Sequence, residues 1–379
     1  MLTNINISRK ELSQIGPFAF EKCNKTEILD LSSNNLTKLY SKSFYGMIYL
    51  KTLNLDFNQI SQIEPEVFSD LVLMTSLDLK YNRLRYLGGN IFENLPELQI
   101  LNLEFNQIEI IEIYAFKNLE KLAKILLKNN NLKSLEPIFF NLSSFNILDV
   151  SVNQIKLVHN DTFKSLSKLT SLNISFNQIS ELNSETFKGA DNLQKLYIFI
   201  NKIEKIDFNF FKKFQNLRIL DLKQNNLSSI QADIFKTLVN LESLNVYLSN
   251  IKAIDLNSLD KINTLQLGNN QITFFSQNSS LLKFLNLNNN PLDNFTYPSI
   301  TLQNSKLATI SLYNCQLKYI DFDLLRNLTF LKSLNIANNL LKLSNETFKN
   351  FSMLNEVTVN NNDVARFKLL YPDISFIGM

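Results

Sequence analysis

Histidine, cysteine and tryptophan are almost missing from this chain of 379 residues, which contains one His, two Cys and no Trp. Cys23 and Cys315 are nearly a whole chain apart, so they fit neither a metal-binding spacing nor a compact disulfide framework. The single histidine, His159, stands between Val158 and Asn160 where a surface turn is expected, and we interpret it as a solvated loop residue. The sequence therefore predicts no metal site.

Long apolar runs, phosphate-binding motifs and concentrated charge are absent as well. No segment reaches the roughly eighteen apolar residues of a membrane span, and the amino-terminal residues lack the apolar core of a signal peptide. The seven glycines form neither G-x-G-x-x-G nor a P-loop pattern, so no cofactor is expected. A dispersed net charge of +3 does not predict nucleic-acid binding. Aspartates do not occupy the same strand position in adjacent repeats, so a catalytic carboxylate pair is not indicated and no enzyme is predicted.

What the chain does contain is a repeat with a period of about 24 residues. The shared frame is L-x-x-L-x-L-x-x-N-x-L, and we call its Asn position the slot. The slots fall on Asn34, Asn58, Asn82, Asn106, Asn130, Asn153, Asn177, Asn201 and Asn225, and then less regularly on Ser249, Asn270, Asn290, Cys315, Asn339 and Asn362. Alternation within x-L-x-L-x predicts a short strand with its leucines inward. The slot amide is expected to satisfy buried backbone groups of the turn after the strand.

A phenylalanine follows the slots at a fixed offset of ten positions. These residues are Phe20, Phe44, Phe68, Phe92, Phe116, Phe140, Phe163, Phe187, Phe211 and Phe235. A large ring at the same place in every repeat predicts a stacked aromatic spine. Because one repeat cannot bury enough apolar surface alone, neighbouring repeats must stack into one elongated domain.

This frame resembles the leucine-rich repeat family, in its 24-residue extracellular form, and is similar to the ectodomains of Toll-type receptors and to secreted leucine-rich-repeat immune proteins. The resemblance implies an α/β-type repeat solenoid, a horseshoe with one parallel β-sheet on the concave face and irregular turns or short helices on the convex face. We expect the solenoid over residues 1–364, with about sixteen repeats that become irregular at 250–300. Residues 365–379 would form a C-terminal tail or a partial cap without cysteines, and a longer parent protein is favoured.

The stretch QKLYIFINKI, residues 194–203, breaks the polar pattern of the predicted outward strand positions. It places Tyr197 where most repeats carry Asn or Asp, and an exposed apolar cluster on a soluble protein indicates an interaction surface. We predict that a protein ligand contacts the concave face at Tyr197, Phe199, Ile200, Arg218, Asp221, Lys223, Tyr247 and Leu248. A structural role is the alternative, since aromatic residues also stabilise sheets by cross-strand pairing. We assign that role to Phe57, Tyr81, Phe105 and Phe176.

Glycosylation sequons are numerous. Candidate acceptors are Asn24, Asn35, Asn141, Asn160, Asn226, Asn294, Asn327, Asn345 and Asn350. Further sequons begin at Asn6, Asn173 and Asn278, and a glycan on Asn173 would oppose ligand binding on the concave face. Because several sequons arise by chance in so Asn-rich a chain, they support secretion only weakly.

These observations favour a non-enzymatic protein-recognition module. By resemblance, it would be the extracellular ligand-binding region of a cell-surface or secreted protein with a receptor-like or innate-immune role, and it would form a homo- or heterodimer or act alone. No membrane insertion by this segment and no nucleic-acid partner are expected. An intracellular scaffold or inhibitor, located in the cytoplasm, is one alternative, and a matrix or adhesion protein is another.

Overall fold

The computed structural model describes residues 3–297, 300–302 and 306–379. Its internal contacts divide the chain into two compact units, which are described separately. Unit 1 comprises Met1–Ile179 and Ser184–Leu193, and unit 2 comprises Ser180–Asn183 and Gln194–Met379.

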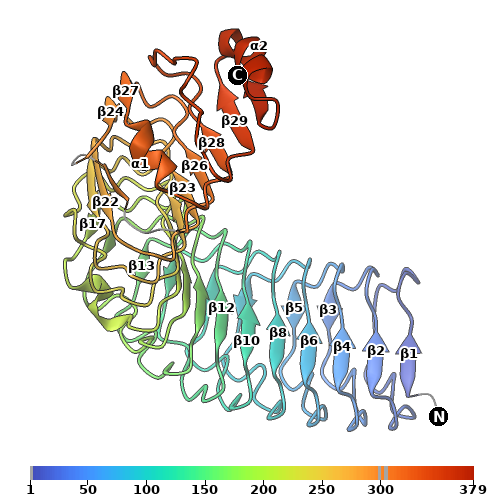
Figure 1. Cartoon of the computed structure of the whole chain (residues 1–379). Helices are drawn as coiled ribbons and strands as arrows, with labels where there is room; N and C mark the ends of the chain where they lie inside the picture. The colour runs from blue at the N-terminus through green and yellow to red at the C-terminus, as the bar shows by residue number, and fades with distance from the viewer. Residues whose placement is uncertain (1–2, 298–299, 303–305) are drawn as a thin grey trace. The chain divides into compact units, whose positions relative to one another are not determined.

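Unit 1 is built on a main sheet of parallel three-residue strands, one from each repeat, which stand side by side in Figure 1. The strands are β1 (Asn4–Asn6), β2 (Ile28–Asp30), β4 (Thr52–Asn54), β6 (Ser76–Asp78), β8 (Ile100–Asn102), β10 (Lys124–Leu126), β12 (Ile147–Asp149) and β14 (Ser171–Asn173). The register places the central apolar residue of each strand opposite that of the next, as with Leu53, Leu77 and Leu101. These side chains are fully buried, so they form one layer of the core.

Unit 2 continues the same construction. Its main strands are β16 (Lys195–Tyr197), β18 (Ile219–Asp221), β19 (Ser243–Asn245), β21 (Thr264–Gln266), β23 (Phe284–Asn286), β26 (Thr309–Ser311), β28 (Ser333–Asn335), β29 (Glu356–Val359) and β30 (Ser375–Gly378). All the described pairings among them are parallel and follow chain order. Parallel stacking of successive repeats is the fold predicted from the sequence, a leucine-rich repeat solenoid.

Short parallel strands form a second line on the other side of most repeats. In unit 1 the pairs are β3 (Lys38–Leu39) with β5 (Gln62–Ile63), β7 (Tyr86–Leu87) with β9 (Ile110–Ile111), and β11 (Ser134–Leu135) with β13 (Leu157–Val158). In unit 2 they are β15 (Glu181–Leu182) with β17 (Lys205–Ile206), and β24 (Asn294–Phe295) with β27 (Tyr319–Ile320). The shorter repeats of unit 2 instead carry a three-stranded sheet of β20 (Ala253–Asp255), β22 (Phe274–Gln277) and β25 (Ile300–Leu302).

Little helix is present in the described residues. It consists of a 3₁₀ turn, η1 (Phe210–Lys213), and the helices α1 (Phe322–Arg326) and α2 (Asn361–Leu370). Phe367 of α2 lies 4.8 Å from Phe348 and 5.5 Å from Phe376 of β30, measured between ring centroids. Residues 361–378 therefore cover the aromatic end of the last repeats with helix and strand.

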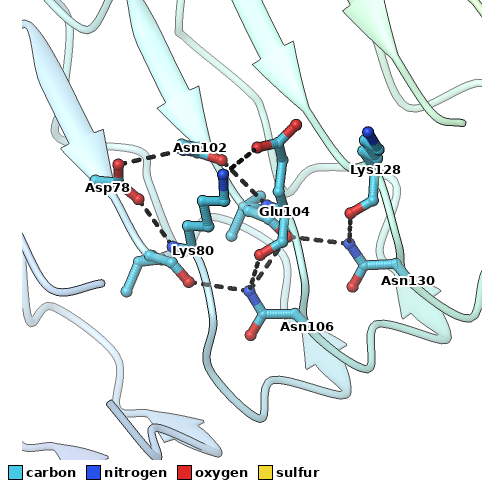
Figure 2. Close-up of polar contacts among 9 residues, drawn as sticks. Asp78, Lys80, Asn102, Glu104, Asn106, Lys128 and Asn130 are labelled. Carbon is cyan, nitrogen blue, oxygen red and sulfur yellow. Dashed lines mark hydrogen bonds and ion pairs between the residues drawn. The ribbon is translucent and has the colours of Figure 1, made fainter. Parts of the chain in front are cut away.

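The slot asparagines form a buried hydrogen-bond ladder, as predicted. The Asn82 amide donates to the carbonyl of Leu79 in its own turn at 3.0 Å and to that of Leu55 in the preceding repeat at 2.9 Å. Its oxygen accepts from the Ile60 amide at 2.9 Å. Figure 2 shows the bonds donated by the side-chain amides of Asn106 and Asn130. Each slot therefore satisfies groups in two repeats at once.

Two substitutes and one error appear among the predicted slots. Ser249 and Cys315 are buried and donate to backbone carbonyls in place of Asn. Burial raises the pKa of the Cys315 thiol to about 11, so it is an inert structural group. The assignment of Asn362 as a slot is wrong, because this residue is exposed in the first turn of α2. The chain turns into a helix directly after β29 instead of entering another slot turn.

The stacked aromatic spine is confirmed from Phe20 to Phe116, whereas Phe163 and Phe187, farther along unit 1, meet edge to face at 5.3 Å. Neighbouring rings from Phe20 to Phe116 lie 6.0–6.3 Å apart and nearly parallel. The next ring is Phe139, which stacks 6.0 Å from Phe116, whereas the predicted Phe140 is 40% exposed. The repeat of Phe139 is one residue shorter than the other repeats of unit 1, and the shortening falls between its slot and its ring. The Ile138 amide bonds back to the Glu136 carbonyl there in a tight turn.

Removal of one slot amide is expected to destabilise the protein strongly. In Asn82→Ala, the buried amide of Ile60 loses its partner, and the carbonyls of Leu55 and Leu79 each lose one of two donors, since Asn58 and Asn106 still donate to them. An unsatisfied buried group costs about 1–3 kcal/mol and each further lost hydrogen bond about 1 kcal/mol, so we expect a loss of about 3 kcal/mol or more in the free energy of unfolding. Urea denaturation measures it. The exposed Gln99→Ala is the matched control, and an equally small effect of both substitutions would contradict the ladder.

Candidate functional site

One face of the main sheet is open to solvent. We call it the open sheet face. It is formed by the half-buried residues that alternate with the buried leucines along the strands. In most repeats the last strand residue is Asn or Asp, and its side chain accepts a hydrogen bond from the amide two residues later. Examples are Asp78 with Lys80 at 2.9 Å and Asp221 with Lys223 at 3.1 Å. The polar row therefore has a structural function, because it closes each strand with an Asx turn.

Tyr197 interrupts this row. A phenol ring cannot make the Asx turn, so this repeat gives up a hydrogen bond that contributes about 1 kcal/mol elsewhere. Tyr197 is half-exposed at the end of β16, and so is Phe199 two residues later. Leu126 at the end of β10 is the corresponding exception in unit 1. The substitution at Tyr197 thus costs local stability and places a ring on the open sheet face.

The register brings most of the predicted residues together at one end of β16, β18 and β19. Tyr197 pairs with Asp221, which pairs with Asn245. Phe199, Lys223 and Tyr247 lie two residues beyond the ends of these three strands, and Ile200 and Leu248 come next after the outer two. We call Tyr197, Phe199, Ile200, Tyr247 and Leu248 the aromatic patch. Its members are all at least partly exposed, and Leu248 is 45% exposed.

Charged groups are inserted into the aromatic patch from its central strand. The Lys223 ammonium lies 4.4 Å from the centroid of the Phe199 ring, which is cation–π geometry. Asp221 is fixed by the Lys223 amide and by the Asn245 amide group at 3.2 Å. Burial raises the pKa of Asp221 above its usual value, although both hydrogen bonds and the Lys223 charge oppose the shift. The patch therefore presents two charged groups between its rings: the Lys223 ammonium, which lies over the Phe199 ring, and the partly desolvated Asp221 carboxyl.

Arg218 does not lie beside the rings. It precedes Asp221 by three residues, roughly 10 Å along the strand. Its guanidinium is 3.3 Å from the Glu242 carboxylate in an exposed ion pair.

Ile200 and Leu248 share a backbone conformation that recurs along the repeats. Both have positive φ, 52° and 54°, at the residue just before the slot. Other repeats place Asn at this position, as at Asn129 and Asn269, or an aromatic residue such as Phe57, and one places the β-branched Val152. A β-branched side chain in the left-handed region is strained, so Ile200 costs stability where Asn would not. Strain held at an exposed position is a reason to examine it for function.

A second exposed cluster in unit 1 was not recognised as a candidate from the sequence. The rings of Phe57, Tyr81 and Phe105 stack with centroids 4.2 and 4.4 Å apart, and Phe57 is 52% exposed. The Lys80 ammonium lies 5.2 Å from the centroids of the Tyr81 and Phe105 rings. Figure 2 shows Lys80 joined to Glu104, with the charged atoms 3.1 Å apart. A run of aromatic residues in three consecutive repeats was the available signal. The stacking of these rings agrees with the structural role predicted for them, which is cross-strand pairing that stabilises the sheet.

The remaining predicted residues are on the surface or in the core as follows. All nine candidate glycosylation asparagines are exposed. Asn173 is half-buried on the open sheet face and donates to Asp149 at 3.2 Å. His159 is exposed in a turn. Among the described residues, no group of three or more His, Cys, Asp or Glu side chains could hold a metal, and no helix is long and apolar enough to cross a bilayer.

Solved structures with the same fold include several recognition proteins. The TLR13–ssRNA13 complex aligns with a TM-score of 0.78 and 25% identity, over 94% of this chain and 55% of that one. A leucine-rich repeat protein of Leptospira interrogans aligns with a TM-score of 0.71 and 21% identity, over 98% and 83%. Drosophila Toll, solved with Spatzle, aligns with a TM-score of 0.70 and 19% identity, over 97% and 47%. The chain thus spans about half the length of the TLR13 and Toll chains.

Family models match most of the sequence. A leucine-rich repeat model matches residues 1–60, 48–108, 143–203 and 191–251. A second model, of the BspA-type leucine-rich repeat region, matches residues 272–368. No curated protein sequence shows significant similarity to the chain. The matched segments coincide with the strands, slots and spine described above, and the chain belongs to the leucine-rich repeat family.

Proposed function

We propose that this chain is a non-enzymatic protein-recognition module that binds a protein ligand through the aromatic patch of unit 2. The observation that carries the proposal is Tyr197, which replaces a structural Asx residue and lies half-exposed on the open sheet face. Rings, a fixed cation and a partly desolvated carboxyl are the composition of interface hot spots. Because the strands fix the patch before binding, little conformational entropy is lost on docking.

The compartment is part of the same proposal. We infer that the chain acts as the extracellular ligand-binding region of a cell-surface or secreted protein with a receptor-like or innate-immune role. The likeness to Toll bound to Spatzle and to a plant peptide hormone receptor bound to its peptide supports this assignment. The exposed sequons support it as well.

Loss of two rings tests the binding surface. We expect Tyr197→Ser combined with Phe199→Ser to weaken ligand binding at least 30-fold, about 2 kcal/mol, because exposed aromatic anchors dominate interface energies. The melting temperature should change little, since neither ring is fully buried. The ligand is first captured on the immobilised wild-type protein from extracellular fluid of the source organism, and its affinity is then measured by calorimetry.

The matched control for this pair is Tyr49→Ser with Phe330→Ser, two exposed aromatic residues outside the patch. Unchanged affinity with a lowered melting temperature would assign Tyr197 and Phe199 to sheet stability instead. A single-stranded RNA oligonucleotide is titrated in parallel. Binding of the RNA that is lost in the double variant would contradict a protein ligand.

Ile200→Asn separates function from stability. Asn accepts the left-handed conformation, so relief of strain, about 1 kcal/mol, should offset the lost apolar contacts and leave the free energy of unfolding equal or higher. Ligand affinity should fall, because an apolar contact is removed. Val152→Asn is the control, since Val152 is β-branched with φ 55° in unit 1. Val152→Asn should change the free energy of unfolding as Ile200→Asn does, but it should leave ligand affinity unchanged. Destabilisation by Ile200→Asn alone would show that Ile200 is a packing residue.

The presence of N-linked glycans on the native protein tests the proposal that it is extracellular. If the chain is extracellular, the native protein should lose apparent mass on treatment with an N-glycosidase, because exposed sequons are available for modification. A variant with Gln at all nine candidate asparagines should run at the deglycosylated position. Identical mobility of the native protein before and after treatment would contradict the extracellular assignment and favour an intracellular scaffold.

A further inference from the structure

A cleft of about 580 Å³ lies in unit 1 between two consecutive repeats, on the side of the short strands. Its lining includes Ile63, Glu66, Tyr86, Gly88, Ile91 and Glu93. Pockets of roughly 300–1,000 Å³ hold small molecules or single large side chains of a partner. None of these residues belongs to the open sheet face, so the cleft is separate from the aromatic patch.

The cleft coincides with one of the breaks between the pairs of short strands. Within the described residues, β5 pairs with β3 and β7 pairs with β9, but β5 and β7 lie in separate sheets. The Glu64 amide donates to the Leu39 carbonyl at 3.0 Å, and the Glu112 amide donates to the Leu87 carbonyl at 3.0 Å. In the part of the chain that the structure describes, no corresponding bond joins Gly88 to Ile63. The backbone edge of β5 therefore faces the cleft.

Two glycines keep the cleft open. Gly88 and Gly89 stand where the flanking repeats carry Glu64–Pro65 and Glu112–Ile113. Neither glycine has positive φ, so the backbone does not require glycine here. A Cβ on Gly88 would lie 3.5 Å from the Tyr86 ring, and the Gly89 amide donates to the Glu112 carboxylate at 2.6 Å. The missing side chains thus leave space beside an aromatic ring.

The chemistry of the lining favours a cation. Glu66 and Glu93 contribute carboxylates, and the lining contains no Lys or Arg. In the described part of the chain, neither carboxylate has an ion-pair partner, whereas Glu64 and Glu97 in the same unit are paired with lysines. The Tyr86 hydroxyl donates to Glu112, which fixes a ring that is 51% exposed. The Glu112 carboxylate accepts from both Tyr86 and Gly89, and these bonds lower its pKa.

We propose that this cleft binds the guanidinium of an arginine side chain presented by a protein partner. Glu66 and Glu93 would accept hydrogen bonds from the fork of N–H groups, with the Tyr86 ring against its face. Ile63 and Ile91 would contact the methylene stem, which buries well against apolar walls. Arginine fits better than lysine because its planar head stacks on a ring and bonds to two carboxylates at once.

The test uses N-acetyl-arginine amide as the probe and the Ile63 and Ile91 methyl groups as reporters in NMR spectra of the whole chain. We expect both methyl signals to shift and saturate with a Kd of about 1 mM, an affinity ordinary for one side chain. The neutral isostere N-acetyl-citrulline amide should produce no saturable shift. N-acetyl-lysine amide should bind at least threefold more weakly than the arginine probe.

Variants locate the site. Glu66→Gln with Glu93→Gln should weaken binding tenfold or more, and Gly88→Leu should abolish it by filling the cleft. Glu21→Gln with Glu120→Gln, two exposed carboxylates elsewhere in unit 1, is the matched control and should bind as the wild type does. Methyl signals remote from the cleft report that each variant is folded. Equal binding of citrulline or lysine, or full binding by the Glu66–Glu93 variant, would overturn the proposal.

Discussion

The fold depends on how a buried turn satisfies its backbone groups. Each repeat must reverse direction directly after a three-residue strand, and the carbonyls of that turn lie inside the solenoid, where water does not reach them. An asparagine amide supplies donors and an acceptor from one side chain, and at Asn82 it bonds to groups in two successive repeats. Ser249 and Cys315 also donate at their slots, but neither makes all of these bonds. Because the slot ties each repeat to its neighbour, the sheet and the spine keep their register.

Because the buried positions are fixed by the repeat, function depends on the outward-facing residues of the strands. Some of these residues are also constrained by the fold. The Asp or Asn at the end of most strands is structural, since its oxygen closes an Asx turn, as at Asp78 and Asp221. A residue that gives up this bond departs from that pattern, as Tyr197 does. Ile200, three residues later, adds a second local cost, because its β-branched side chain adopts the left-handed conformation that precedes the slots. These two costs within one repeat support the proposal that the aromatic patch contacts a ligand.

The sequence predicted the strands, the slots and most of the spine because all three recur at a fixed period. It failed where a position depends on something other than the period. Phe139 replaced Phe140 because the alignment shows that a repeat is shorter but not where the missing residue falls. Arg218 was placed beside the rings because neighbours in sequence can lie at opposite ends of a strand. The cleft at Gly88 depends on a break between two short strands, which no spacing reveals, although a Gly-Gly pair where neighbours carry side chains was a usable signal.

Several carboxyl groups on the open sheet face have pKa values raised by burial. Burial, together with the charges of Asp78 and Asp30, raises the pKa of Asp56, and burial raises the pKa of Asp78 itself. A carboxyl with a raised folded-state pKa favours folding when protonated, so its contribution to stability is present at low pH and is lost as pH rises through that pKa. At neutral pH these carboxylates, like Asp221 in the aromatic patch, therefore oppose folding. A cationic group of a bound partner would offset that penalty. Binding of such a partner would therefore increase the stability of the folded protein. The proposed binding of a partner at this surface would thus be favoured by the charges that the fold alone leaves poorly solvated.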